Sequence, residues 1–173
     1  MPNHSIPELV PPTRLMMTPG PSSVDPRVYR AMSTPLVGHL DPWFNEVLVP
    51  DVQDLLRRVY QTDNRITFPI SASGSGGIEA SVLNPLESGD EAIVCVNGWF
   101  SQRMAEIADR TGAKVTRVEC PYGRPVDLDD VRRAAKGRKI KLLGLAHGET
   151  STGVVQRLDD FRAVADEIGA LLV

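Results

Sequence analysis

The sequence of 173 residues lacks the features that mark membrane, metal and nucleic-acid proteins. Its uncharged apolar runs are only a few residues long, so no transmembrane span is expected. Its three histidines are far apart and no CxxC or HxxxH spacing occurs, which argues against a metal site. The net charge of −3 and the lack of a long Lys/Arg cluster argue against nucleic acid or a membrane surface as the main partner.

Cysteine is scarce as well. Cys95 lies inside an apolar run and Cys120 follows another, so we expect two reduced, buried thiols rather than a disulfide framework. The first residues, Met1 to His4, do not open a basic region followed by an apolar core, so no leader peptide is expected. These observations favour a cytoplasmic protein.

An apolar content of 42% over 173 residues is enough for a globular domain with a core. Residues 1–13 contain four prolines and little apolar periodicity, which predicts an extended arm. We therefore expect an arm over 1–13 and a globular part over 14–173.

Hydrophobic periodicity predicts an α/β alternation along the globular part. The expected helices are 24–32, 43–60, one opened by the stretch 71–80, 100–110, 127–137 and 158–168, and the expected strands are 93–96, 114–119, 140–146 and 171–173. Pro50 must kink or restart the second helix. The alternation predicts a mainly parallel sheet flanked by helices.

The stretch Ser71–Ala80 is rich in glycine and serine, follows the apolar run 66–70 and opens a helix, which is typical of a phosphate cradle. A nucleoside-triphosphate loop is excluded, since it needs a Gly-Lys-Ser/Thr ending and no lysine occurs before position 114. A dinucleotide fingerprint is excluded because Glu79 stands where its third glycine belongs. A single phosphate monoester remains, and the alternative is a flexible helix entrance.

Ligands of parallel sheets bind beyond the carboxyl ends of the strands. The stretch 71–77, the residues 97–100 and the residues 147–153 all follow apolar runs in this sequence, and we expect each of them to be a loop at the end of a strand. We expect these three segments to converge on one site.

In their order along the chain, several motifs resemble those of class V aminotransferases, above all the alanine–glyoxylate and serine–glyoxylate (serine–pyruvate) enzymes. They are Thr18-Pro-Gly-Pro-Ser22, Gly38-His39, the 71–80 stretch, Leu83-Asn84 with Gly89-Asp90, Asn97-Gly98 with Gln102-Arg103, and His147-Gly-Glu-Thr-Ser-Thr-Gly153. The resemblance implies the N-terminal part of the large domain of a fold-type I transferase that uses pyridoxal 5′-phosphate. Such enzymes are usually homodimers.

The resemblance also implies roles for single residues, each with a structural alternative. It places Ser73, Gly74 and Ser75 on the cofactor phosphate, Phe100 on the pyridine ring and Thr150 beside the phenolic oxygen, and it places Gly20 and His39 at the substrate. Phe100 could instead be a core residue while Trp99 faces the site. Thr150 could be a turn hydroxyl, and His39 a structural hydrogen-bonding group. His147 and Glu149 are expected to organise their loop.

The function implied is transfer of an amino group between alanine or serine and glyoxylate or pyruvate. By the resemblance, the aspartate at the pyridine nitrogen and the lysine that forms the Schiff base would lie beyond Val173, so no catalytic residue is assigned and the chain alone is expected to be inactive. Two alternatives stay open. One is a ureidoglycine–glyoxylate aminotransferase or a related lyase, and the other is a non-catalytic truncated subunit or assembly module.

Overall fold

The computed structural model describes residues 8–173, so the part of the expected arm over 1–7 lies outside the described residues. The chain divides into two compact units, Met1–Thr67 and Phe68–Val173, which are described separately. Residues 8–13 have no helix or strand and are exposed. No helix among the described residues is long and apolar enough to cross a membrane.

The described part of the first unit, residues 8–67, holds three helical elements, α1 (Pro26–Met32), η1 (Phe44–Leu48) and α2 (Val49–Tyr60). The Asp25 side chain accepts a hydrogen bond from the Arg27 N–H at 2.8 Å, and Pro26 occupies the first helical position. Both features are typical of a helix start, and they explain why α1 begins two residues later than the expected helix over 24–32.

The interruption expected at Pro50 takes the form of a π-helical turn. The Val49 N–H donates to the Phe44 carbonyl, five residues back, and the α-helix resumes at Val49. Proline lacks an N–H and its ring crowds the carbonyl four residues earlier. The wider turn of η1 lets the chain pass Pro50, which then lies in the first turn of α2.

The second unit is built on a parallel four-stranded sheet with the strand order β2-β1-β3-β6. The strands are β1 (Glu91–Val96), β2 (Lys114–Glu119), β3 (Ile140–Gly144) and β6 (Leu171–Leu172). In the β1–β2 pair, Glu91 lies opposite Lys114 and Val96 opposite Glu119. The expected parallel sheet is confirmed, and all four strands lie where periodicity predicted them.

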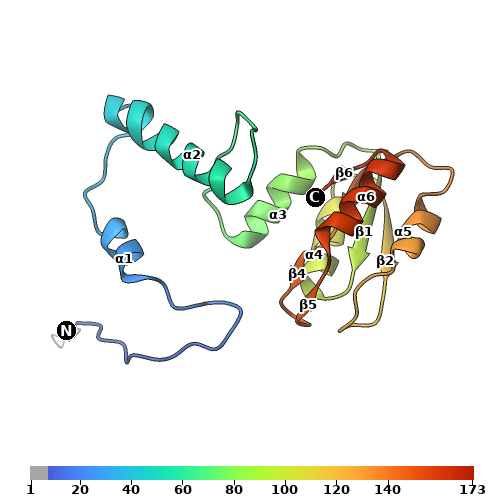
Figure 1. Ribbon diagram of the computed structural model, residues 1–173, viewed down its shortest axis with the longest axis horizontal. Helices are drawn as coiled ribbons and strands as arrows, with labels where there is room; N and C mark the ends of the chain where they lie inside the picture. Colours follow the sequence, from blue (N-terminus) through green and yellow to red (C-terminus); the bar gives the residue numbers. More distant parts are fainter. Residues whose placement is uncertain (1–7) are drawn as a thin grey trace, which may run out of the picture. The chain divides into compact units, whose positions relative to one another are not determined.

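Helices cover both faces of this sheet (Figure 1). On one face α5 (Leu128–Ala135) and α6 (Leu158–Ile168) bury Val131 and Phe161 against Ile93 and Leu143. On the other, α3 (Gly74–Leu83) and α4 (Trp99–Asp109) pack on the sheet through a separate apolar cluster. The burial of β1 on both sides accounts for its continuous apolar sequence.

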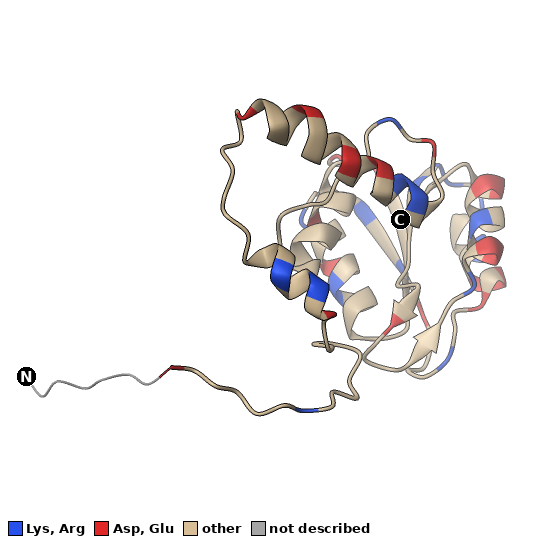
Figure 2. Cartoon of the chain, turned by 60° about the vertical axis from the view of Figure 1, so that its left-hand side comes forward, with Lys and Arg blue, Asp and Glu red and all other residues tan. Residues whose placement is uncertain are grey.

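Capping residues set the helix ends in this unit. The Asp127 side chain accepts from the Asp129 N–H at 2.8 Å at the start of α5. The first turn of α5 is acidic and its last turn is basic, an arrangement that the helix dipole favours. Lysine and arginine are interspersed with aspartate and glutamate over the chain (Figure 2). Gly169 ends α6 in the left-handed conformation at φ 68°, as the sequence predicted.

Two features differ from the sequence expectations. The apolar run 66–70 before the phosphate stretch is not a strand, and Ile66, Phe68 and Ile70 are largely exposed. A two-stranded antiparallel hairpin, β4 (Gly148–Glu149) and β5 (Val154–Val155), was not expected. Strands of two residues leave no detectable alternation in a sequence.

Candidate functional site

The carboxyl ends of the parallel strands lie at one edge of the sheet, and two of the three segments expected there meet directly. The segment after β1, residues 97–101, is hydrogen-bonded to the β4–β5 hairpin. The third segment, 71–77, leads into α3, which packs beside α4. It does not, as expected, follow a strand, and no hydrogen bond joins it to the other two segments among the described residues, so its convergence with them stays a prediction.

The first turn of α3 has free hydrogen-bond donors. Ser73 is the N-cap residue, but its side chain does not cap the helix. Within residues 8–173 no acceptor is found for the N–H groups of Gly74, Ser75 and Gly76, nor a partner for the hydroxyls of Ser73 and Ser75. A Cβ atom added at Gly74 or Gly77 would meet nothing within 4 Å. This helix start is open to an anion.

The first turn of α4 is closed by a carboxylate of the chain itself. Glu149 is only 1% exposed, and its Oε2 accepts from the Ser101 N–H at 2.9 Å and lies 3.0 Å from the Ser101 hydroxyl. Its Oε1 accepts from the Ser151 hydroxyl at 2.6 Å and from the Phe100 N–H at 3.4 Å. Of the two helix starts, only that of α3 is left for an external anion.

The environment of Glu149 keeps its carboxyl ionised. Burial raises the pKa of this carboxyl, but the hydrogen bonds donated by Ser151 and Ser101 together outweigh burial and leave the pKa below its ordinary value. An ionised carboxylate at a helix N-terminus is also favoured by the helix dipole. The sequence predicted that Glu149 organises its loop, and the structure identifies the partners.

Sequence reasoning gave no role to three further residues of this network, Ser101, Ser151 and Gly98. The Ser101 hydroxyl accepts from the N–H groups of Asn97 and Gly98, both at 3.0 Å, and the Ser151 hydroxyl accepts from the Trp99 N–H at 2.9 Å. A Cβ atom at Gly98 would come within 2.3 Å of Glu149 Cγ. Serine and glycine at a helix start are a local signal, but their common partner lies 48 residues away from Ser101.

Two aromatic rings stand at the start of α4. Phe100 is 38% exposed, so it is not the core residue that the alternative reading required. Trp99 is also exposed, and the two rings meet edge to face with centroids 5.2 Å apart. The guanidinium of Arg103 lies 5.6 Å from the centre of the Trp99 ring. Both rings are therefore accessible for stacking.

Thr150 and His147 lie on the β4–β5 hairpin and beside it. Thr150 is exposed in the turn that follows Glu149, and within the described part of the chain its hydroxyl has no hydrogen-bond partner. His147 Nδ1 lies 2.9 Å from the Gln156 carbonyl, and the Gln156 N–H donates to the His147 carbonyl. His147 thus joins the two arms of the hairpin.

The two expected substrate residues belong to the first unit. His39 is exposed, and its carbonyl accepts from the Asn45 side chain at 2.9 Å. Gly20 lies in the turn that the Thr18 hydroxyl closes on the Pro21 carbonyl at 2.8 Å. Their roles at a substrate stay predictions.

The lysines of the chain lie at the other edge of the sheet. Lys114 begins β2, and Lys141 near the start of β3 donates to Asp90 at 2.6 Å. Lys136 follows α5, and Lys139 directly precedes β3. No cluster of His, Cys, Asp and Glu suited to a metal ion occurs among residues 8–173.

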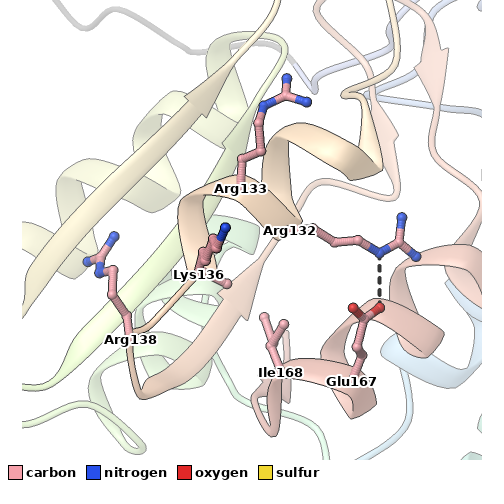
Figure 3. Close-up of a pocket in the computed structure, with 7 residues that line it drawn as sticks. Arg132, Arg133, Lys136, Arg138, Glu167 and Ile168 are labelled. Atoms are coloured by element: carbon pink, nitrogen blue, oxygen red, sulfur yellow. Dashed lines mark hydrogen bonds and ion pairs between the residues drawn. The ribbon is translucent and has the colours of Figure 1, made fainter.

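A groove of about 510 Å³ also lies away from the carboxyl ends of the strands. It is lined by Arg132, Arg133, Ala135, Lys136, Arg138, Glu167 and Ile168 (Figure 3). Arg132 pairs with Glu167 at 2.9 Å, and Arg138 pairs with Glu91 at 3.0 Å. The groove thus lies apart from the segments that follow the strands, and two of its cations are paired with carboxylates.

Comparison with known proteins decides the family. The family model described as aminotransferase class-V matches residues 49–173. The chain belongs to this family. Class-V membership confirms the resemblance found in the sequence motifs.

Similar class-V proteins carry glyoxylate aminotransferase names. The chain is 42% identical over 151 residues to the (S)-ureidoglycine–glyoxylate transaminase of Bacillus subtilis, covering 87% of this chain and 36% of that protein. It is 38% identical over 162 residues to the alanine–glyoxylate aminotransferase of Mus musculus, covering 94% of this chain and 39% of that protein. It thus spans well under half the length of these relatives.

A solved structure confirms the fold. The alanine–glyoxylate aminotransferase of Nostoc sp. superposes with a TM-score of 0.90 at 39% identity, over 97% of this chain and 44% of that one. The described fold is therefore part of a fold-type I aminotransferase domain.

Proposed function

We propose that the protein takes part in amino transfer that depends on pyridoxal 5′-phosphate. The observation that carries the proposal is the start of α3, where the N–H groups of Gly74 to Gly76 and the hydroxyls of Ser73 and Ser75 are free for a phosphate. The start of α4, the other helix entrance at this site, is closed by Glu149. Membership of the class-V family supports this assignment.

The residues of the second unit fit this cofactor. Backbone N–H groups and serine hydroxyls are suitable donors for the dianion of a phosphate monoester. Phe100 offers an accessible aromatic face to a planar ring, and Thr150 offers a free hydroxyl to an oxygen substituent. When bound, pyridoxal 5′-phosphate supplies an electron sink for carbanion chemistry.

The proposed substrates are a small amino acid, alanine or serine, and glyoxylate or pyruvate. The names of the alanine–glyoxylate relatives support this choice. Ureidoglycine as the amino donor is the alternative, and the observation that supports it is the 42% identity to the Bacillus subtilis transaminase.

We further propose that the protein is a cytoplasmic homodimer. The helices of the first unit bury none of their residues. A pocket of about 650 Å³ there is lined largely by apolar residues: Ala31, Met32, Thr34, Pro35, Leu36, Val37, Trp43, Phe44 and Leu48. An apolar surface of this kind is suited to a second copy. The two free cysteines support a reducing compartment.

The experiment is an amino-transfer assay on the protein at its whole natural length. We expect pyruvate or serine-derived 2-oxo acid to form from L-alanine or L-serine with glyoxylate. Activity with ureidoglycine alone would establish the alternative donor. Binding of the cofactor without any transfer would contradict the enzyme proposal and favour the assembly module. Light scattering of the same sample tests the dimer, which a monomer at tens of micromolar would contradict.

A further inference from the structure

One side chain bonds to both segments that carry the ring contacts of the proposed site. The Glu149 carboxylate accepts from Phe100 and Ser101 at the start of α4, and from Ser151 in its own turn. Phe100 is thus itself a donor to this carboxylate, and Thr150 is its chain neighbour. The Glu149 carboxylate is thus the hydrogen-bond acceptor for these N–H groups.

The carboxylate is surrounded by donors and closely packed. Both carboxylate oxygens accept hydrogen bonds from N–H and O–H groups. A side chain at Gly98 would collide with Glu149 and with the Ser151 hydroxyl. A neutral amide of the same size has only one acceptor oxygen, so it would direct an NH2 group at some of these donors. The site therefore requires a side chain that has the size of glutamate and also two acceptor oxygens with a negative charge.

We propose that Glu149 is a positioning residue, whose buried carboxylate fixes the start of α4 to the β4–β5 turn and so holds Phe100 and Thr150 in place for the cofactor ring. This inference rests on the proposed function, because only a ring bound there gives the fixed geometry a use. Glu149 acts on the ring side of the site, whereas the phosphate donors of α3 do not depend on it.

The first test uses Trp99 as a reporter in a Trp43→Phe background, which leaves no other tryptophan among the 173 residues of the sequence. Glu149→Ala should raise the quenching of Trp99 by acrylamide and lower its near-ultraviolet circular dichroism. Added acetate should restore both signals, because it places a carboxylate among the vacated donors, while acetamide should not. Glu106→Ala is the matched control, since Glu106 is an exposed carboxylate on the same helix.

The second test separates positioning from general loss of structure. Pyridoxine 5′-phosphate, which has no aldehyde to react with lysines, and inorganic phosphate are titrated into the parent and Glu149→Ala. We expect the affinity for pyridoxine 5′-phosphate to fall by about two- to twelvefold, the range that one aromatic stacking contact supplies. The affinity for inorganic phosphate should stay unchanged.

The outcomes are distinct. Equal Trp99 signals in parent and variant, or rescue by acetamide as well as acetate, would overturn the inference. An equal loss of affinity for both probes would overturn it too, since it would indicate a structural role only. A parent that binds neither probe would contradict the proposed function. The acetate rescue would then still test whether the Glu149 carboxylate fixes the start of α4 to the β4–β5 turn. If Glu149→Ala does not fold, Glu149→Gln keeps the volume, and an unchanged Trp99 signal in it would refute the inference.

Discussion

Replacing Gly98 by alanine perturbs the site at its most crowded point. The new Cβ would lie 2.3 Å from Glu149 Cγ, 2.5 Å from Glu149 Cδ and 2.6 Å from the Ser151 hydroxyl. Contacts under 3.0 Å force something to move. The atoms nearest to the new methyl group belong to the hydrogen-bond network that closes α4.

The size of the effect follows from two terms. Overpacking a filled site costs about 1–3 kcal/mol. Displacing the carboxylate also weakens its bonds to Ser101 and Ser151, and a hydrogen bond to a charged group contributes about 1.5–3 kcal/mol. Since the two costs are not additive, we expect a loss of at least about 2 kcal/mol in the free energy of unfolding.

The assay is thermal unfolding followed by circular dichroism. For a unit of this size the midpoint should fall by about 8 °C or more. Gly148→Ala is the matched control, because a Cβ at Gly148 meets nothing within 4 Å. If Gly98→Ala melts with the control, the close packing of Gly98 on Glu149 is refuted.

Two further predictions concern titration and thiol reactivity. Because the folded pKa of Glu149 is lowered, its contribution to stability is full above the unfolded pKa of about 4.3 and is lost as the pH falls through the folded value. Glu149→Gln should therefore make the free energy of unfolding less dependent on pH at acid pH. An unchanged pH dependence, measured by urea unfolding at several pH values, would contradict this. Burial raises the pKa of Cys95 to about 12, so at pH 8 this thiol should react with a disulfide reagent only on unfolding, and later than the less buried Cys120. Equal reaction rates of the two thiols in the native protein would refute that.

The sheet was predictable because its signals are local. The strand over 114–119 is rich in β-branched residues, and α6 ends where Gly169 allows the left-handed turn. The run 66–70 has the apolar content of a strand, but a strand also needs a partner, and local composition does not report one. Pairing between distant segments decides such elements.

The candidate site was predictable in part for the same reason. The stretch 71–80 and the hydroxyl residues of the hairpin can be recognised as candidates from their residue types and their order in the sequence. The closure of α4 by Glu149 was not predictable, because it joins residues 48 positions apart through a turn whose shape depends on Gly98. Sequence patterns identified candidate residues, and the fold shows which of them are hydrogen-bonded or packed against one another.

The most direct test of the account measures the binding of pyridoxine 5′-phosphate to the start of α3. The parent should bind this probe saturably, and the double variant Ser73→Ala, Ser75→Ala should bind it at least about tenfold more weakly, since in the proposed site each hydroxyl would donate to the charged phosphate. Ser81→Ala is the control on the same helix, because its hydroxyl bonds to the Ile78 carbonyl. Pyridoxine without the phosphate should bind far more weakly than the phosphate ester. Equal binding of the ester by parent and double variant, or equal binding of the two probes by the parent, would contradict the phosphate site on which the proposed function depends.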